Sequence, residues 1–194
     1  MRKTLKKRLK KDQILFSAVS VINRNGYENT TMEDISRELQ MTKGSLYYYF
    51  KNKDDLIYQC HTLVLSLATK ELEDILQKED ITAEETLRKM VSTHIEYAIE
   101  EREIFNLIFE PKSTFNKEQL EPVLKLRKYY SRLFDEAIQQ GIDHKEFQVK
   151  DPILVRMMIL GAMNWVQQWY DPNGKLSKSE LKERYGDYII KLVN

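Results

Sequence analysis

The sequence predicts an all-α protein of about nine helices, and three observations support this fold class. Straight-chain residues that favour helices are abundant, whereas the 194 residues include only 6 Gly and 4 Pro. Apolar residues recur at helical spacing along most of the chain. No segment alternates between apolar and polar residues for long enough to predict a strand.

The first two helices are predicted from the residues at their ends. The first runs from about Lys7 to Asn25, and Gly26 ends it because glycine enters the left-handed C-cap conformation without steric cost. The run Thr30-Thr31-Met32-Glu33 predicts a capping box, in which a threonine oxygen and Glu33 each accept a backbone N–H of the other. This box opens a short second helix that ends near Gln40.

Cap residues also place the later helices. Thr42 caps a short third helix that reaches Phe50, and Asn52 caps a long fourth helix from Lys53. Gly141 is expected to end a later long helix. Capping boxes at 82–85 and 177–180 and an Asp-Pro pair at 151–152 mark further starts. The remaining helices are thus predicted over about 82–101, 104–109, 117–140, 152–170 and from 177 onward.

Charge is distributed unevenly along the chain. Residues 1–60 hold 12 Lys or Arg against 7 Asp or Glu, and the remainder holds 19 against 23. Seven of the basic residues lie between Arg2 and Lys11, where there is no acidic residue. A basic N-terminal part and a mildly acidic remainder favour a polyanionic partner for the N-terminal part alone.

Composition also limits the compartment. No apolar run approaches the roughly 18 residues that a membrane-spanning helix needs, and the charged N-terminus is unlike a secretory signal. The single cysteine, Cys60, cannot form an internal disulfide, which fits a reducing cytosol. We therefore expect a soluble, cytoplasmic protein without a membrane partner.

Residues 31–50 are the most informative about function. Two short helices flank a turn there, the arrangement that presents a second helix to the DNA major groove. Four apolar residues face inward and fix the crossing of the two helices: Ile35, Leu39, Leu46 and Phe50. The second helix keeps hydroxyl groups, a cation and small residues exposed, which suits phosphates and base edges. Gly44 in its first turn lets the backbone approach the duplex closely.

An ordered set of residues in this region resembles the DNA-binding domain of the TetR family. The set comprises Gly26-Tyr27, the run Thr30-Thr31-Met32-Glu33-Asp34-Ile35 and the run from Lys43 to Leu56. The resemblance covers roughly residues 8–60. It implies a helix-turn-helix domain over 8–68, a ligand-binding and dimerisation domain over 69–194, and relief of repression when an inducer binds. The expected DNA contacts are Thr31, Thr42, Lys43, Gly44, Ser45, Tyr47, Tyr48, Tyr49 and Lys53.

The last two predicted helices suggest a dimer interface. Helix 152–170 is apolar almost all round, as expected of a helix that is buried on more than one side. In TetR-like proteins such helices form a four-helix bundle with those of a second subunit, which also suits two half-sites of a palindrome. The candidate interface residues are Leu160, Met163, Leu181, Tyr185 and Tyr188. The alternative is that both helices complete a monomeric core.

The C-terminal segment suggests an effector. The residues from Gly161 to Ser177, with Trp165 and Trp169, resemble TetR relatives that respond to acyl-coenzyme A thioesters. Tryptophan could stack on adenine, and Arg127 or Lys128 could pair with phosphates. The candidate pocket residues are Phe105, Phe109, Arg127, Tyr130, Met158, Trp165 and Trp169. Two alternatives remain: these residues form an ordinary core, or a cage of Glu96, Glu100, Glu103, Tyr97 and Phe105 binds cationic drugs, as in a multidrug-responsive repressor.

Other classes of function are less well supported. His61, His94 and His144 lie far apart and lack the spacing of a metal site, and no phosphate-binding glycine loop is present. We expect no enzyme, no cofactor and no metal. The sequence predicts a DNA-binding transcription regulator, as a repressor that a small hydrophobic effector releases, with long-chain acyl-CoA as first candidate. A TetR-fold protein of the nucleoid or of cell division remains an alternative.

Overall fold

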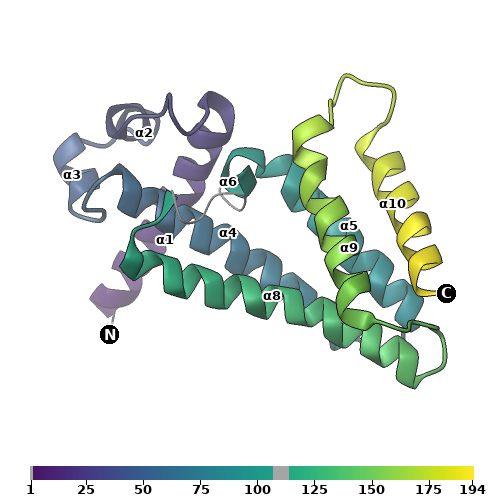
Figure 1. Ribbon diagram of the computed structural model, residues 1–194. Coiled ribbons are helices and arrows are strands. Elements are labelled where there is room, and N and C mark those ends of the chain that lie inside the picture. Colours follow the sequence, from purple (N-terminus) through teal and green to yellow (C-terminus); the bar gives the residue numbers. More distant parts are fainter. Residues whose placement is uncertain (1, 107–113) are drawn as a thin grey trace. The chain divides into compact units, whose positions relative to one another are not determined.

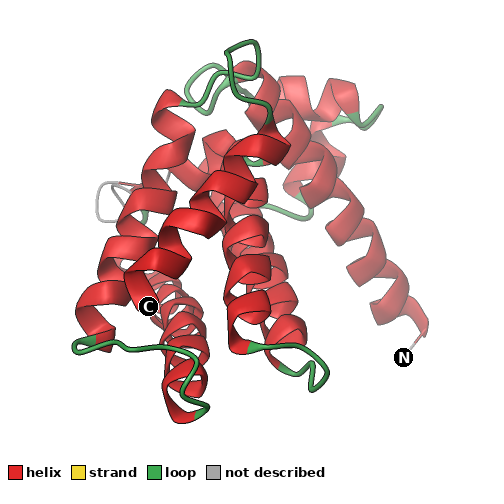
Figure 2. Ribbon diagram, turned by 90° about the vertical axis from the view of Figure 1, so that its right-hand side faces the viewer, coloured by secondary structure: helices red, strands yellow, loops and turns green. Residues whose placement is uncertain are grey.

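The computed structural model describes residues 2–106 and 114–194, with side chains from Lys11 onward. Figure 2 shows that the described residues form helices and loops and no strand, which confirms the predicted all-α class. Nine helices lie in these residues (Figure 1): α1 (Arg2–Asn25), α2 (Met32–Glu38), α3 (Lys43–Tyr47), α4 (Lys53–Leu76), α5 (Ala83–Glu100), α6 (Arg102–Asn106), α8 (Lys117–Asp143), α9 (Pro152–Trp169) and α10 (Lys178–Val193).

The chain forms two compact units. The first contains residues 1–64 and 101–123, and the second contains 65–100 and 124–194. Helices α4 and α8 each contribute residues to both units. The sequence predicted domains over 8–68 and 69–194, which places residues 101–123 in the C-terminal domain, whereas these residues belong to the first unit.

The core of the first unit is built on one face of α1. Ile14, Ala18 and Ile22 are among its buried residues, as the helical spacing predicts. Cys60 of α4 is also buried there, and its thiol donates to the carbonyl oxygen of Leu15 at 3.8 Å. Burial raises the pKa of this thiol. The cysteine is therefore a packing residue that joins α4 to α1.

Most predicted caps are present. The Thr82 and Glu85 side chains each accept the other's backbone N–H at 3.1 Å. Asp151 accepts from the backbone N–H of Leu154 at 3.0 Å, and Ser177 forms a capping box with Glu180. These interactions satisfy first-turn N–H groups that have no partner within the helix. Local sequence thus determines where α5, α9 and α10 begin.

Three predicted boundaries were wrong. Helix α1 already begins at Arg2, and α3 ends at Tyr47 instead of Phe50. Helix α8 continues through Gly141 to Asp143, and the residue with positive φ is Lys145, at 62°. A Cβ atom at position 141 would lie 2.1 Å from the Phe147 ring. This glycine therefore makes room for an aromatic ring and does not end the helix.

The core of the second unit lies between α5 and its neighbours. Helix α5 packs against both α9 and α10 (Figure 1). The largest fully buried side chains in this core are Phe134, Leu72, Leu87, Met90 and Ile95. The apolar spacing along α4, α5, α8, α9 and α10 thus corresponds to one continuous core.

Candidate DNA-binding surface and effector unit

The helix-turn-helix is anchored by a few buried residues. Ile35 of α2 and Leu46 of α3 are 0% exposed, and Phe50, just after α3, is 1% exposed. Gln40 in the turn has φ of 50°, and the N–H of Met41 donates to the carbonyl oxygen of Ser36 at 2.9 Å. The packing leaves the opposite side of α3 available to a partner.

The structure exposes most of the predicted DNA contacts. Thr31, Thr42, Lys43, Gly44, Ser45, Tyr47 and Tyr48 are exposed, whereas Tyr49 and Lys53 are half-buried. A Cβ atom built at Gly44 would meet no atom within 4 Å, so packing within the chain does not require glycine there. Close approach to a partner therefore remains the predicted role of Gly44.

Both threonines also act as helix caps. Thr31 accepts from the N–H of Asp34 at 3.2 Å, and Asp34 accepts from the Thr31 N–H at 3.0 Å. The carboxylate of this capping box is therefore Asp34, which corrects the predicted Glu33. Thr42 caps α3 by accepting from the N–H of Ser45 at 3.1 Å. Each hydroxyl fixes the first turn of a helix at the surface where DNA contacts are predicted.

Glu33 has a role that the sequence did not indicate. Its carboxylate forms an ion pair with the ammonium of Lys43, across the turn between α2 and α3. Their hydrogen bond lowers the pKa of Glu33 and raises that of Lys43. The ten-residue separation has no local signature, because only the crossing of the two helices brings the residues together. Lys43, a predicted DNA contact, thus carries a carboxylate partner in the free chain.

Lys53 is positioned by the segment that precedes α2. Its ammonium lies 4.4 Å from the centroid of the Tyr27 ring and donates to the carbonyl oxygen of Glu28 at 3.4 Å. The Tyr27 hydroxyl donates to Asp54 at 3.5 Å. Burial, followed by the charge of Asp54, raises the pKa of Tyr27. The ring therefore holds a cation at the start of α4.

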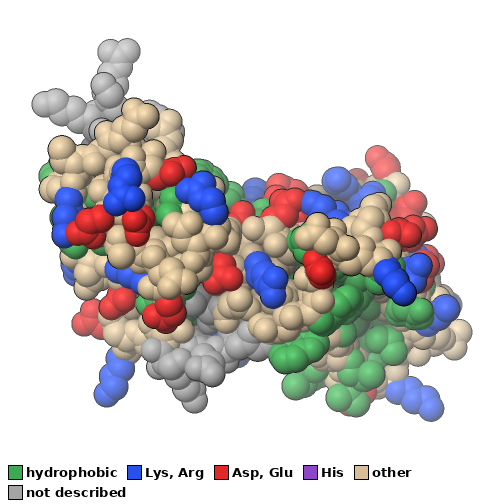
Figure 3. All heavy atoms as spheres, turned by 90° about the horizontal axis from the view of Figure 1, so that it is seen from above, with side chains coloured by type: hydrophobic (Ala, Val, Ile, Leu, Met, Phe, Trp, Pro, Cys, Tyr) green, Lys and Arg blue, Asp and Glu red, His purple; other side chains and the backbone are tan. Residues whose placement is uncertain are grey.

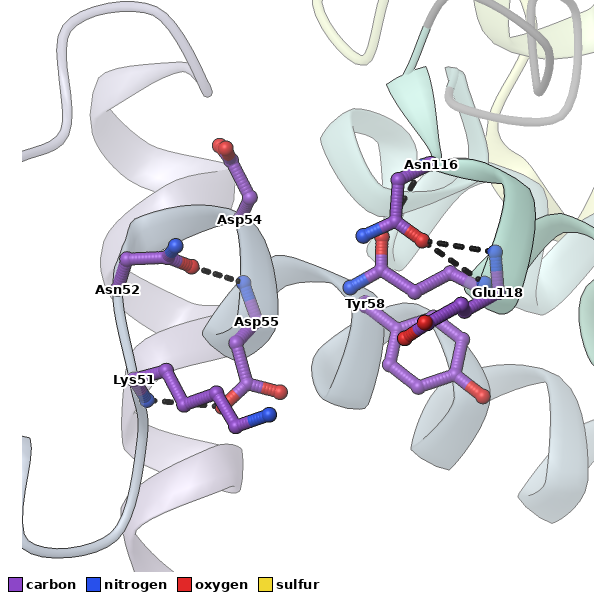
Figure 4. Close-up of a pocket in the computed structure, with 8 residues that line it drawn as sticks. Lys51, Asn52, Asp54, Asp55, Tyr58, Asn116 and Glu118 are labelled. Atoms are coloured by element: carbon purple, nitrogen blue, oxygen red, sulfur yellow. Dashed lines mark hydrogen bonds between the residues drawn. The ribbon is translucent and has the colours of Figure 1, made fainter.

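A polar pocket of about 310 Å³ adjoins the start of α4 (Figure 4). The residues that line it are Lys51, Asn52, Asp54, Asp55 and Tyr58, just before and within α4, and Asn116, Glu118 and Gln119, at the start of α8. The polar groups mostly cap helices. Asp55 accepts from the Lys51 N–H at 2.9 Å, Asn52 accepts from the Asp55 N–H at 2.8 Å, and Asn116 accepts from the first-turn N–H groups of α8. The polar lining of the pocket is thus accounted for by the capping groups at the N-terminal ends of α4 and α8.

The predicted effector residues do not form one enclosed site within the described residues of the second unit. Tyr130 is buried and Arg127 is half-buried, but Met158, Trp165 and Trp169 are 50%, 56% and 45% exposed. These three lie on the side of α9 that faces away from its buried stripe. Phe105 is buried in the first unit, and Phe109 lies outside the described residues.

The predicted interface residues likewise include both buried and exposed side chains. Met163 and Leu181 are 0% and 2% exposed and belong to the core of the second unit, so they are not on the free chain's surface. Leu160 and Tyr185 are half-buried, and Tyr188 is 64% exposed. The exposed apolar side chains of α9 and α10 are Ile153, Leu154, Met157, Met158, Trp165, Trp169, Tyr188 and Leu192. Figure 3 shows hydrophobic side chains gathered on this part of the surface.

The acidic cage proposed for cationic drugs is not free. Lys178 of α10 pairs with Glu96 and Glu100 of α5, and Lys182 pairs with Glu96 as well. The hydrogen bond from Lys178 is the main cause that lowers the pKa of Glu96 to about 2. These carboxylates are already neutralised by the chain's own lysines, which argues against this alternative.

The histidines differ in environment. His61 and His94 are buried, and His144 is exposed. His94 Nδ1 lies 3.0 Å from the hydroxyl of Tyr130, and burial lowers the pKa of His94 to about 4. In the described part of the chain, no three His, Cys, Asp or Glu residues are grouped to hold a metal ion. None of the described helices has the length and apolarity to cross a membrane.

Comparisons with known proteins identify the family. Residues 14–60 match the model of bacterial regulatory proteins of the tetR family, and residues 80–193, more than half of the chain, match that of the tetracyclin repressor-like C-terminal domain. The fatty acid metabolism regulator protein of Bacillus subtilis (strain 168) is 28% identical over 85% of this chain and 89% of its own length.

Solved structures show the same fold. Transcriptional regulator FadR of Bacillus subtilis, in complex with stearoyl-CoA, has a TM-score of 0.74 and 24% identity, covering 94% of this chain and 98% of that chain. AibR, in complex with isovaleryl coenzyme A and operator DNA, has a TM-score of 0.74 and 23% identity, covering 94% and 97%. The family matches cover both the helix-turn-helix and the helices around α5, α9 and α10, and the chain belongs to the TetR family of transcriptional regulators.

Proposed function

We propose that this regulator binds operator DNA as a homodimer through the exposed side of α3, and that an acyl-CoA thioester releases it. The observation that carries DNA binding is the surface of α3, where Thr42, Ser45, Tyr47 and Tyr48 are exposed over a buried anchor, Leu46. These side chains offer hydroxyl groups to phosphates and base edges. We place the protein in the cytoplasm, where operator DNA is found.

The homodimer is supported by the apolar surface of α9. Leu154, Met157, Met158 and Trp165 recur at the spacing of one helical face, and all are at least half exposed. A patch of this kind marks an interaction site in a soluble protein. Gly161 lies on the same face, and a Cβ atom there would meet nothing within 4 Å, so another helix can approach closely. A two-fold partner would bury this face against its own copy.

The acyl-CoA effector is supported by the relatives and by Arg127. Both FadR and AibR are seen with coenzyme A thioesters. Arg127 is half-buried, burial alone lowers its pKa, and no ion pair joins it to another described residue. A desolvated guanidinium without a carboxylate partner favours a phosphate. We therefore assign Arg127 to the phosphate end of coenzyme A.

The experiment is binding of the purified protein to DNA from its own gene neighbourhood, with and without stearoyl-CoA. We expect salt-dependent binding to a palindromic site, and release by the thioester. Specific binding without release would keep the regulator and remove the acyl-CoA effector. Binding to many scattered genomic sites without a palindrome would instead support a role in the nucleoid or in cell division.

A further inference from the structure

The buried stripe of α9 contains one residue that does not fit an apolar core. Its buried residues are Ile159, Met163, Val166 and Gln167. Gln167 is 1% exposed, as fully buried as the apolar residues beside it. Both its amide nitrogen and its amide oxygen lack a hydrogen-bond partner among the described residues.

A buried amide without partners is unfavourable, because it has lost its hydrogen bonds to water and gained none in return. Native proteins therefore satisfy nearly all such groups. A glutamine offers two N–H donors and one acceptor oxygen. Position 167 is thus suited to a molecule that enters the core of the second unit with both an acceptor and a donor.

A series of hydrogen-bonded polar groups begins about one helical turn before Gln167. Asn164 precedes it by three residues, which places both on the same side of α9. Asn164 forms a hydrogen bond with His94 of α5, and His94 lies 3.0 Å from the hydroxyl of Tyr130 of α8. Phe134 and Met163, which are apolar residues of the same core, are both 0% exposed. A polar line thus crosses an apolar interior from α8 to α9.

The charges around this line distinguish between ligands. Arg127 of α8 is half-buried and is assigned to the phosphate end of coenzyme A, and no Lys or Arg is among the fully buried residues in the described part of the chain. Burial lowers the pKa of His94 to about 4, so its ring is neutral near pH 7. A carboxylate in this core would be a buried charge without a partner, which is strongly unfavourable. An uncharged carbonyl group meets no such penalty.

We propose that Gln167 recognises the thioester end of the acyl chain: its Nε2 donates to the thioester carbonyl oxygen, and its Oε1 accepts from the neighbouring pantetheine amide N–H. The acyl chain then lies among the apolar residues around Met163. This assignment rests on the proposed acyl-CoA effector and deepens it, because it selects a thioester over a free fatty acid.

The first test needs only the natural chain. Calorimetric titration compares stearoyl-CoA with S-octadecyl-CoA, a thioether in which a CH₂ group replaces the carbonyl. We expect the thioether to bind about tenfold more weakly, equivalent to about 1.4 kcal/mol. Equal affinity for the two compounds overturns the role of Gln167 and leaves the acyl-CoA effector standing. Binding of neither compound overturns both proposals.

The second test removes the amide and keeps its approximate volume. Gln167→Met is expected to bind stearoyl-CoA about tenfold more weakly and to lose the preference for the thioester over the thioether. Its melting temperature should not fall, because the substitution removes unsatisfied groups. Gln139→Met, at an exposed position on α8, is the matched control and should keep the preference. A tenfold preference that persists in Gln167→Met overturns the assignment.

Discussion

The exposed residues of α3 and those of α9 differ in chemistry, although both helices rest on buried apolar side chains. Helix α3 and its N-cap residue present Thr42, Ser45 and Tyr47, which carry hydroxyl groups. Helix α9 presents Leu154 and Met157, which carry no hydrogen-bonding side-chain atoms beyond a weak thioether acceptor. The first surface can satisfy a hydrated polyanion, whereas the second is predominantly apolar and is buried most favourably against another apolar surface. One chain thus prepares two different kinds of association.

The largest expected effect tests what supports the α3 surface. Phe50→Ala should lower the free energy of unfolding by about 3–5 kcal/mol, because Phe50 is 1% exposed. Phe16→Ala is the control, since Phe16 is 53% exposed in the same unit, and a change below about 0.5 kcal/mol is expected. Urea denaturation measures both. Similar losses in the two variants would show that the helix-turn-helix does not depend on its buried anchor.

The next effect tests the α9 surface. Met157→Asp places a charge on the apolar face and should weaken dimerisation by about 2–4 kcal/mol. Sedimentation equilibrium measures the monomer–dimer constant. Gln139→Asp, on α8 and outside this face, should leave that constant unchanged. A variant at position 157 that remains as dimeric as the natural chain would remove α9 from the interface.

A smaller effect is expected for a single DNA contact. Tyr47→Ala should weaken operator binding by about 1–3 kcal/mol and leave the dimer intact. Tyr47 is 42% exposed, and Tyr129 of the second unit is 44% exposed. Tyr129→Ala is therefore the matched control for the loss of an exposed ring, and fluorescence anisotropy with labelled operator DNA compares the two. Equal operator affinity in both would contradict the assigned recognition surface.

The smallest effect concerns the charged side of the second unit. The pKa of Glu96 is lowered from 4.5 to about 2, so the pair with Lys178 stabilises the fold above about pH 4.5 and this contribution is lost as the pH falls toward 2. Because both side chains are about one-third exposed, we expect less than about 1 kcal/mol. Between pH 5 and about pH 2.5, the free energy of unfolding of Lys178→Met should fall less than that of the natural chain. Urea denaturation at the two pH values measures this difference.

The sequence predicts helix starts that depend on local caps better than it predicts contacts between residues far apart in the chain. Ser177 and Thr82 cap their helices as expected, because the partner of each lies three residues away. The prediction that Gly141 ends α8 is wrong because the Phe147 ring, which requires the glycine, is brought to it only by the loop after α8. The same limit explains Glu33, whose partner Lys43 is reached only across the helix crossing.

Periodicity could not assign the two sides of α9. Met158 and Met163 have similar sequence surroundings, yet one is 50% exposed and the other is 0% exposed. Because α9 is apolar almost all round, its sequence pattern does not show which side of the helix packs into the core of the same chain. The sequence does not distinguish Gln167, because a glutamine between valine and glutamine has the pattern of a surface residue, whereas the structure buries it.

The buried thiol of Cys60 gives the first unit a natural reporter of its own opening. It is the only cysteine of the chain, and it is sealed between α4 and α1. Burial suppresses the thiolate, the form that reacts with alkylating and disulfide reagents. The rate of labelling by a thiol reagent therefore measures how often α1 separates from α4. Operator DNA, by holding the helix-turn-helix together, should slow that rate.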